Sequence, residues 1–325
     1  MNVKLLRDGA AGDRYLETVA AVLRSDGIAA ECHTLKDWQT GKGSGNPKTD
    51  LVVVDSEHVA AVAAPYAVVA VERGCAMEDA LRSPDAADAA ARRLAADAQC
   101  KAVARARTFW VACSEWAAAH CRRHTGRLAD RIILPGVDVD AVFPSARQVK
   151  RETKVPVVMH DCGEPRRGSA CIDAVATALA GAFAVKRLGG KPSEMAEALR
   201  GADLWLSLDA SEQAVTHVPA ALASDLVVVG TNVGALWPYC CGTRAGRADV
   251  LGGAAWLNRE VGAVVFDWRH RADPALVGKI VREAWAKRGE VRGREYARRW
   301  YSMETFRRKW HEAVLLAGQR LEVTA

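Results

Sequence analysis

The sequence predicts an α/β protein of two domains, each with a mostly parallel sheet covered by helices. Half of its 325 residues are apolar, enough for two domains of about 150 residues each. Short runs rich in β-branched residues alternate with segments of helical period, which is typical of βαβ units. A polar stretch rich in Arg and Lys, residues 145–154, interrupts this alternation near the middle. We therefore expect a linker there, with one domain on each side.

In the first half, apolar runs predict strands at residues 2–6, 49–55 and 66–72. Between the first two, Leu16, Val19 and Leu23 recur at helical spacing, and Gly27 is placed to end the helix. An alanine-rich helix over 83–106 and a strand over 108–114 follow. Ser114 is a natural N-cap for a helix over 115–126. A further apolar segment, 131–144, precedes the linker.

The alternation resumes after the linker. We expect strands at 155–160, 183–189 and 203–208, with helices at 169–182 and 193–202. The stretch SLDASEQAVTHVPAALASDLVVVGTNVG, residues 207–234, then reads as the end of a strand, a loop with the single acid Glu212, a helix that opens near Val218, and another apolar strand. Two such halves predict a ligand cleft between them, at the carboxyl ends of both sets of strands.

The net charge of +6 lies entirely in the C-terminal tail. Residues 279–325 contain twelve Lys and Arg against six Asp and Glu. Apolar and aromatic residues recur in this tail at three- and four-residue steps, as an amphipathic packed helix requires: Tyr296, Trp300, Tyr301, Phe306, Trp310, Val314 and Leu315. Its arginines are expected on a solvated helix face. Contact with a polyanion such as DNA, or with a membrane surface, is the alternative.

Cysteine and apolar patterns exclude several other classes. The nine cysteines form an odd set without C-x-x-C pairs, which favours reduced thiols. His120, Cys121 and His124 lie close in sequence, but no second ligand pair has the spacing of a structural zinc site, so no metal is expected. No apolar run approaches the roughly 20 residues of a membrane span, and no signal peptide opens the chain. The expected location is cytoplasmic.

Four segments in order resemble the retaining nucleotide-sugar glycosyltransferases of family 4, which have the GT-B fold. They are CSEWAAAHCRRHTG with IILPGVDVDAVFP, then GADLWLSLDASEQ, AALASDLVVVGTNVG and YSMETFRRKW. The matches cover about residues 105–312. The resemblance implies two Rossmann-like domains facing a central cleft. Residues 1–150 would bind the acceptor, 151–300 would bind the donor, and 301–325 would form a basic helix packed back on the first domain.

The resemblance implies a donor site without a divalent metal. It implies no cofactor either, because the nucleotide sugar, a UDP- or GDP-sugar, is itself the substrate. Arg167 and Glu212 take the catalytic positions. Arg167, with Arg166 second, would clamp the diphosphate in a forked geometry, and Glu212 would accept hydrogen bonds from sugar hydroxyls. The full set of implied donor-binding residues is Arg166, Arg167, Gly168, Asp209, Glu212, Ala214, Val215 and Thr216.

Two family positions are changed. A second glutamate, which in the family contacts the nucleotide ribose, reads Ala220, and an arginine after the first strand of the second domain reads Cys162. On the acceptor side, the glycine-rich loop RDGAAGDRY and the strand end AVERG match family positions, with Glu72 in place of a histidine. The implied acceptor-side residues are Gly9, Gly12, Asp13, Arg14, Glu72 and Arg73.

Each assignment has a structural alternative. The two arginines would serve as a solvated turn, Glu212 as a helix cap, Gly9 and Gly12 as backbone turns, and Glu72 as an ordinary strand-end carboxylate. His160, His217 and Asp209 are not expected to act as bases.

The predicted activity is hexosyl transfer to a hydroxyl acceptor with retention of anomeric configuration. The acceptor is a glycan, a lipid-linked sugar, a small metabolite, or a hydroxymethylated base in phage DNA bound through the basic tail. Two alternatives remain: a degenerate GT-B protein that binds a nucleotide or a partner without catalysis, and a nucleotide-sugar epimerase of the same fold.

Overall fold

The computed structural model describes residues 1–8, 14–43, 45–105, 107–141, 155–161, 168–188, 192–210, 216–239, 249–251 and 253–320. For residues 14, 192–194, 238–239 and 249 it describes the backbone alone. Chain contacts divide the protein into two compact units. Unit 1 comprises residues 1–81, 86–135 and 304–325, and unit 2 comprises 82–85 and 136–303. The predicted domain boundary at residue 150 falls in 142–154, outside the described residues.

Unit 1 contains a six-stranded parallel sheet in the order β2-β1-β3-β4-β5-β6. Its strands are β1 (Asn2–Arg7), β2 (Ala30–Thr34), β3 (Asp50–Asp55), β4 (Ala67–Glu72), β5 (Thr108–Ala112) and β6 (Arg131–Ile132). Its helices are α1 (Arg14–Ser25), α2 (Leu35–Gln39), the 3-10 helix η1 (Ser56–Ala61), α3 (Ala76–Arg82), α4 (Ala86–Val103), α5 (Glu115–Thr125) and α11 (Met303–Arg320).

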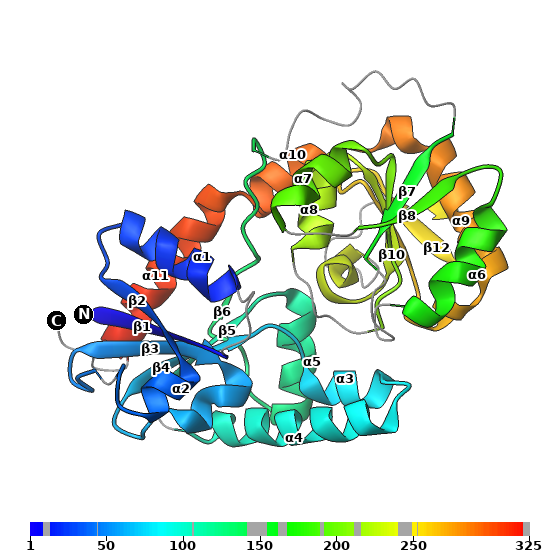
Figure 1. Cartoon of the computed structure of the whole chain (residues 1–325). Coiled ribbons are helices and arrows are strands. Elements are labelled where there is room, and N and C mark those ends of the chain that lie inside the picture. The colour runs from blue at the N-terminus through cyan, green and yellow to red at the C-terminus, as the bar shows by residue number, and fades with distance from the viewer. Residues whose placement is uncertain are drawn as a thin grey trace. The chain divides into compact units, whose positions relative to one another are not determined.

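Helices cover both faces of this sheet, as Figure 1 shows. On one face Trp38 of α2 and Ala102 of α4 pack on the strand residues Leu6, Val54 and Ala70. On the other face lie α1 and α11, which meet through aromatic rings. Strands buried on both sides read as continuous apolar runs, which is why β3 and β4 were predictable from sequence.

Unit 2 contains a seven-stranded sheet in the order β11-β12-β13-β10-β9-β7-β8. The strands are β7 (Val157–His160), β8 (Ala184–Arg187), β9 (Leu204–Ser207), β10 (Val227–Thr231), β11 (Asp249–Leu251), β12 (Ala255–Asn258) and β13 (Ala263–Phe266). Five are parallel, and β12 and β11 extend the sheet in antiparallel pairing. The helical elements are α6 (Ser169–Leu179), α7 (Pro192–Arg200), α8 (His217–Ala223), η4 (Gly234–Tyr239), η5 (Trp268–Ala272), α9 (Pro274–Ala286), η6 (Arg288–Glu290) and α10 (Gly293–Trp300).

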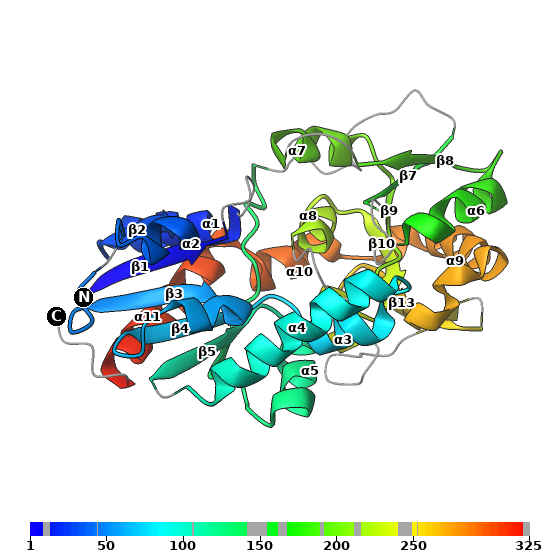
Figure 2. The same ribbon diagram turned by 60° about the horizontal axis from the view of Figure 1, so that its bottom comes forward.

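The core of unit 2 lies between the sheet and the pair α6 and α9, where Val158, Leu206 and Val229 contact Val175 and Ile280. The helices α8 and α10 pack together on the opposite face. This division appears in both views of the ribbon (Figures 1 and 2). Right-handed crossovers explain why α6 and α8 lie on opposite faces of the sheet. The chain crosses from β7 to β8 toward one edge of the sheet, and from β9 to β10 toward the other edge.

Local signals in the sequence account for several helix ends. The Ser114 hydroxyl accepts a hydrogen bond from the backbone N–H of Ala117 at 2.9 Å, so the predicted N-cap of α5 is confirmed. Gly126 ends the same helix in the left-handed conformation, and Gly27 has a φ of 78° just after α1.

The C-terminal tail differs from the single helix that its periodicity suggested. It forms α10 and α11, separated at Tyr301 and Ser302, where the backbone N–H of Val137 donates to the Tyr301 carbonyl at 2.7 Å. Val137 and Ser302 form an isolated parallel β-bridge at this break. None of the helices in the described ranges combines the length and apolar character that crossing a bilayer requires.

Candidate functional site

The carboxyl end of the unit 2 sheet has a topological switch point between β7 and β9. From β7 the chain crosses to β8 on one side, whereas β9 lies on the other side of β7. In open parallel sheets ligands bind at such points, because the two loops diverge and leave room between them. The loop after β7 carries the predicted diphosphate clamp, and the loop after β9 carries the predicted sugar contact.

Gly168 brings helix α6 close to the end of β9. It precedes α6 with a φ of 84°, and an added Cβ would lie 2.5 Å from Leu208 Cβ and 3.0 Å from the Leu208 carbonyl oxygen. Both the conformation and the close approach exclude a side chain. The predicted donor-binding residue Gly168 therefore has a backbone role in the described structure, and it sets the start of α6 beside the switch point.

The segment that follows β9 is fixed by hydrogen bonds. The Ser207 hydroxyl donates to the Asp209 carboxylate at 2.7 Å, and the Thr231 hydroxyl donates to the Asp209 carbonyl at 2.6 Å. Arg271 donates to the Leu208 carbonyl at 3.2 Å. Asp209, a predicted donor-binding residue, is thus held at the carboxyl end of β9.

The structure also places Asp161 beside His217 at this switch point. Asp161 directly follows β7, and His217 is the first residue of α8. His217 Nδ1 lies 2.6 Å from Asp161 Oδ2. The imidazole also contacts the fully buried indole of Trp205, with 5.8 Å between the ring centroids. Sequence reasoning set His217 aside and did not consider Asp161, because the two are 56 positions apart in the chain.

Other donor-side predictions have different outcomes. Thr216 precedes α8 without capping it through its side chain. Ala220, at the position of the family's second glutamate, is fully buried. A group of predicted residues lies outside the described ranges: Cys162, Arg166, Arg167, Glu212, Ala214 and Val215.

His160, the last residue of β7, is buried next to this site. Burial lowers its pKa below the usual value, and the charge of Asp161 opposes this shift only partly. The ring is therefore neutral near pH 7.

In unit 1 the corresponding switch point lies between β1 and β3. Asp8 follows β1, and its carboxylate lies 4.0 Å from the imidazole of His58 on η1, which follows β3. Asp55, the last residue of β3, forms an ion pair with Arg73. Arg73 was predicted on the acceptor side, and the structure places it next to this switch point. Of the other predicted residues, Gly9, Gly12 and Asp13 lie outside the described ranges, and Arg14 is described as backbone at the start of α1.

Glu72, predicted near the acceptor, points into unit 1. It is 2% exposed and accepts a hydrogen bond from the Gln99 side-chain amide at 2.6 Å. Burial raises the pKa of its carboxyl well above the usual value, although a hydrogen bond from Ser56 opposes this. The structure thus shows Glu72 as an interior partner of Gln99.

We expect Glu72→Gln to raise the free energy of unfolding at neutral pH. A carboxyl with a raised folded-state pKa contributes its stability below the unfolded pKa near 4.5, and this is lost as pH rises toward the folded pKa. The amide is neutral throughout, so its advantage over wild type should grow between pH 4.5 and 8 in thermal melts. Glu31→Gln is the control of opposite sign, because Lys4 lowers the pKa of Glu31. A variant that is less stable by the same amount at every pH would contradict the prediction.

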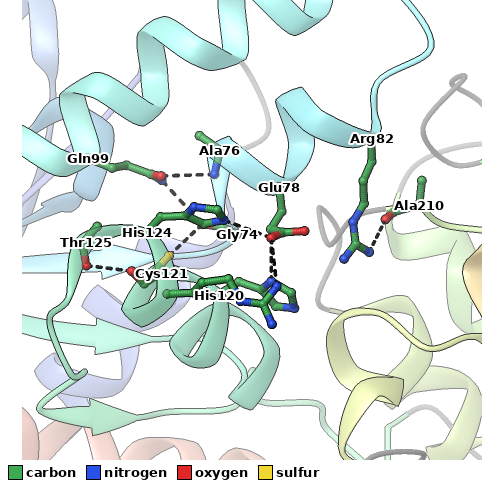
Figure 3. Close-up of polar contacts among 11 residues, drawn as sticks. Gly74, Ala76, Glu78, Arg82, Gln99, His120, Cys121, His124, Thr125 and Ala210 are labelled. Atoms are coloured by element: carbon green, nitrogen blue, oxygen red, sulfur yellow. Dashed lines mark hydrogen bonds and ion pairs between the residues drawn. The ribbon is translucent and has the colours of Figure 1, made fainter.

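Sequence reasoning missed a carboxylate–histidine cluster in unit 1, drawn in Figure 3. The buried carboxylate of Glu78 on α3 lies 2.9 Å from His120 Nδ1 and 3.0 Å from His124 Nε2. The two histidines are four residues apart on α5 and so share one helix face. Within the described ranges no group of His, Cys, Asp and Glu has an arrangement that could hold a metal ion. His120 and His124 are two of the three residues considered for zinc, and in the structure both contact Glu78.

Four arginines of the basic tail form ion pairs with three carboxylates from earlier in the chain. Arg294 and Arg298 of α10 both contact Asp140, at 3.2 Å and 3.0 Å. On α11, Arg307 lies 3.1 Å from Asp26, and Arg320 pairs with Asp130. These pairs reduce the positive field that contact with a polyanion would need.

No protein-family model matches the sequence, and no curated protein matches it either. Solved structures do match along the whole chain. Sucrose-phosphate synthase from Thermosynechococcus elongatus has a TM-score of 0.76 at 12% identity, over 98% of this chain and 99% of that one. HepE from Anabaena, in complex with UDP-glucose, has a TM-score of 0.67 at 13% identity, over 97% and 100%.

WaaG, a glycosyltransferase involved in lipopolysaccharide biosynthesis, has a TM-score of 0.63 at 14% identity, over 98% of this chain and 99% of its own. At these identities the likeness bears on the fold. The two parallel-sheet units, the return of α11 to unit 1, and these matches confirm the predicted fold class: the chain has the GT-B fold.

Proposed function

We propose that this chain is a glycosyltransferase that moves a hexose from a UDP- or GDP-sugar to a hydroxyl acceptor. The observation that carries the proposal is the switch point of unit 2, where Gly168 brings α6 against the end of β9. Its support is the full-length likeness to HepE, whose structure contains UDP-glucose. Unit 2 would bind the donor, and unit 1 would bind the acceptor near Asp8, Asp55 and Arg73.

The chemistry explains the residue types. Breaking the anomeric C–O bond gives an oxocarbenium-like state while negative charge grows on the departing diphosphate. Arg167 and Arg166 would stabilise that charge, together with backbone N–H groups. Glu212 would orient the sugar through its hydroxyls. By its resemblance to family 4, we propose retention of configuration without a metal ion, with the leaving phosphate taking the acceptor proton.

We propose a glycan, a lipid-linked sugar or a small metabolite as the acceptor in preference to DNA. The tail arginines Arg294, Arg298, Arg307 and Arg320 all contact carboxylates of the same chain. A DNA-modifying enzyme would need such side chains to contact phosphates. Hydroxymethylated DNA remains an acceptor to test, and transfer to it would replace this preference.

The first test is a thermal shift with UDP, GDP, ADP, TDP and CDP and their sugar conjugates. A ligand at about 100 times its Kd adds roughly 2.7 kcal/mol, which is a shift of several degrees. We expect one nucleotide to give that shift and Arg167→Ala to abolish it. Arg200→Ala is the matched control, because Arg200 ends α7 at the opposite, amino end of the sheet.

Other results would overturn the donor site or support one of the two alternative functions. No shift with any nucleotide at millimolar concentration would overturn the donor site. Conversion of the sugar nucleotide without an acceptor would identify an epimerase. Binding without any turnover would indicate the non-catalytic protein that the buried Ala220 favours.

A further inference from the structure

We infer that His217, oriented by Asp161, binds the ribose of the donor nucleotide in place of the missing second glutamate. The inference rests on the proposed function, since it names a contact to the nucleotide at that same site. It starts from two observations in unit 2. Ala220 is fully buried and offers no polar group, and His217, one turn earlier on the same helix, contacts Asp161 at the end of β7.

The position of the pair fits a nucleotide contact. Asp161 directly follows β7 and His217 begins α8, so their hydrogen bond joins the carboxyl end of β7 to the start of α8 beside the switch point. His217 and Ala220 are three residues apart on α8 and therefore share one helix face. The histidine thus lies on the same helix face as a glutamate at position 220, which in the family would contact the ribose.

The chemistry of the pair also fits. The neutral imidazole has one N–H, and on Nδ1 it can donate to the Asp161 carboxylate across 2.6 Å. In this tautomer Nε2 keeps a lone pair that can accept a hydrogen bond. A glutamate binds ribose by accepting from its hydroxyls, and Nε2 offers the same function. With 25% of its side chain exposed, His217 is accessible to a ligand, whereas Asp161 at 8% is a buried support.

The ring is held in place on a second side. Trp205 lies on β9 between Leu204 and Leu206, whose side chains belong to the core under α6 and α9. Because side chains alternate along a strand, Trp205 faces the α8 side, where its indole contacts the imidazole. Asp161 and Trp205 thus restrict the orientation of His217 before any ligand binds. Such preorganisation is what a specific hydroxyl contact requires.

The test measures preference for ribose by isothermal titration calorimetry. The probes are UDP and its 2′-deoxy and 3′-deoxy analogues, with the GDP series if the thermal screen selects guanine. We expect wild type to bind the ribonucleotide roughly three- to tenfold more tightly than at least one deoxy analogue, the value of one hydrogen bond. His217→Ala should reduce that ratio to about one by weakening the ribonucleotide alone, and Asp161→Asn should reduce it in the same direction.

The matched control is a second histidine–aspartate pair, in unit 1, where His311 Nδ1 lies 3.1 Å from Asp26. His311→Ala and Asp26→Asn should leave the ribose preference unchanged. His217→Gln is a second variant, whose amide oxygen can accept from a hydroxyl, so it should retain part of the preference.

The possible failures are distinguishable. An unchanged ratio in His217→Ala, with wild type still binding the nucleotide, would overturn this inference and leave the proposed function in place. Equal weakening of the ribo and deoxy forms would also overturn it, because that result indicates a contact to phosphate. No binding to wild type would overturn both proposals.

Discussion

Truncating Trp310 to alanine should lower the free energy of unfolding of unit 1 by about 3–5 kcal/mol, the usual cost of removing a buried tryptophan. The indole is 0% exposed and packs against Tyr15 of α1 and Phe306 of its own helix, with 6.4 Å between ring centroids in both cases. Trp310 therefore makes a main packing contact between α11 and the rest of unit 1. Helix α11 belongs to unit 1 although it follows unit 2 in the sequence.

Differential scanning calorimetry would measure the effect. At roughly 2–4 °C per kcal/mol, the expected decrease in Tm is about 6–20 °C. Leu315→Ala is the control on the same helix. Leu315 is 44% exposed, so its truncation should cost less than about 1 kcal/mol. If both variants lowered Tm equally, the return of α11 to unit 1 would not contribute to the core as argued.

Most of the fold was predictable because its signals are local. β3 and β4 are buried on both faces and read as unbroken apolar runs, and Ser114 and Gly27 mark helix ends through backbone chemistry that operates within a few residues. β2 was not predicted. It is an edge strand whose residues, AECHT, are mostly half-exposed and polar, so they carry no strand pattern.

The candidate site was less predictable because its contacts join distant parts of the chain. Gly168 was predicted from a family motif. The reason why a glycine is needed there, the close approach of Leu208, is visible only in the folded chain. The contacts of Asp161 with His217 and of Glu78 with two histidines depend on which strands are neighbours. The sequence does place His120 and His124 on one helix face, yet nothing near them indicates that their partner is Glu78.

Replacing Gly168 with alanine should abolish nucleotide binding, or weaken it more than tenfold, while costing about 2–5 kcal/mol of stability. Part of the cost, about 1–2 kcal/mol, comes from placing a side chain at a φ of 84°. The remaining 1–3 kcal/mol comes from overpacking, because the new methyl group would lie 2.5 Å from Leu208 Cβ. A Cβ atom cannot rotate away, so either the start of α6 or the segment after β9 must move.

Gly181→Ala separates the conformational cost of a positive φ from the cost of overpacking. Gly181 follows the other end of α6 with a φ of 80°, but an added Cβ there meets nothing within 4 Å. It should therefore show the conformational cost alone and bind the nucleotide as wild type does. Calorimetry of both variants, with circular dichroism to confirm folding, gives the comparison. If folded Gly168→Ala bound the nucleotide normally, the approach of α6 to β9 would not form the donor site. Because displacing either element separates the two loops of the switch point, the loss should affect every nucleotide that wild type binds.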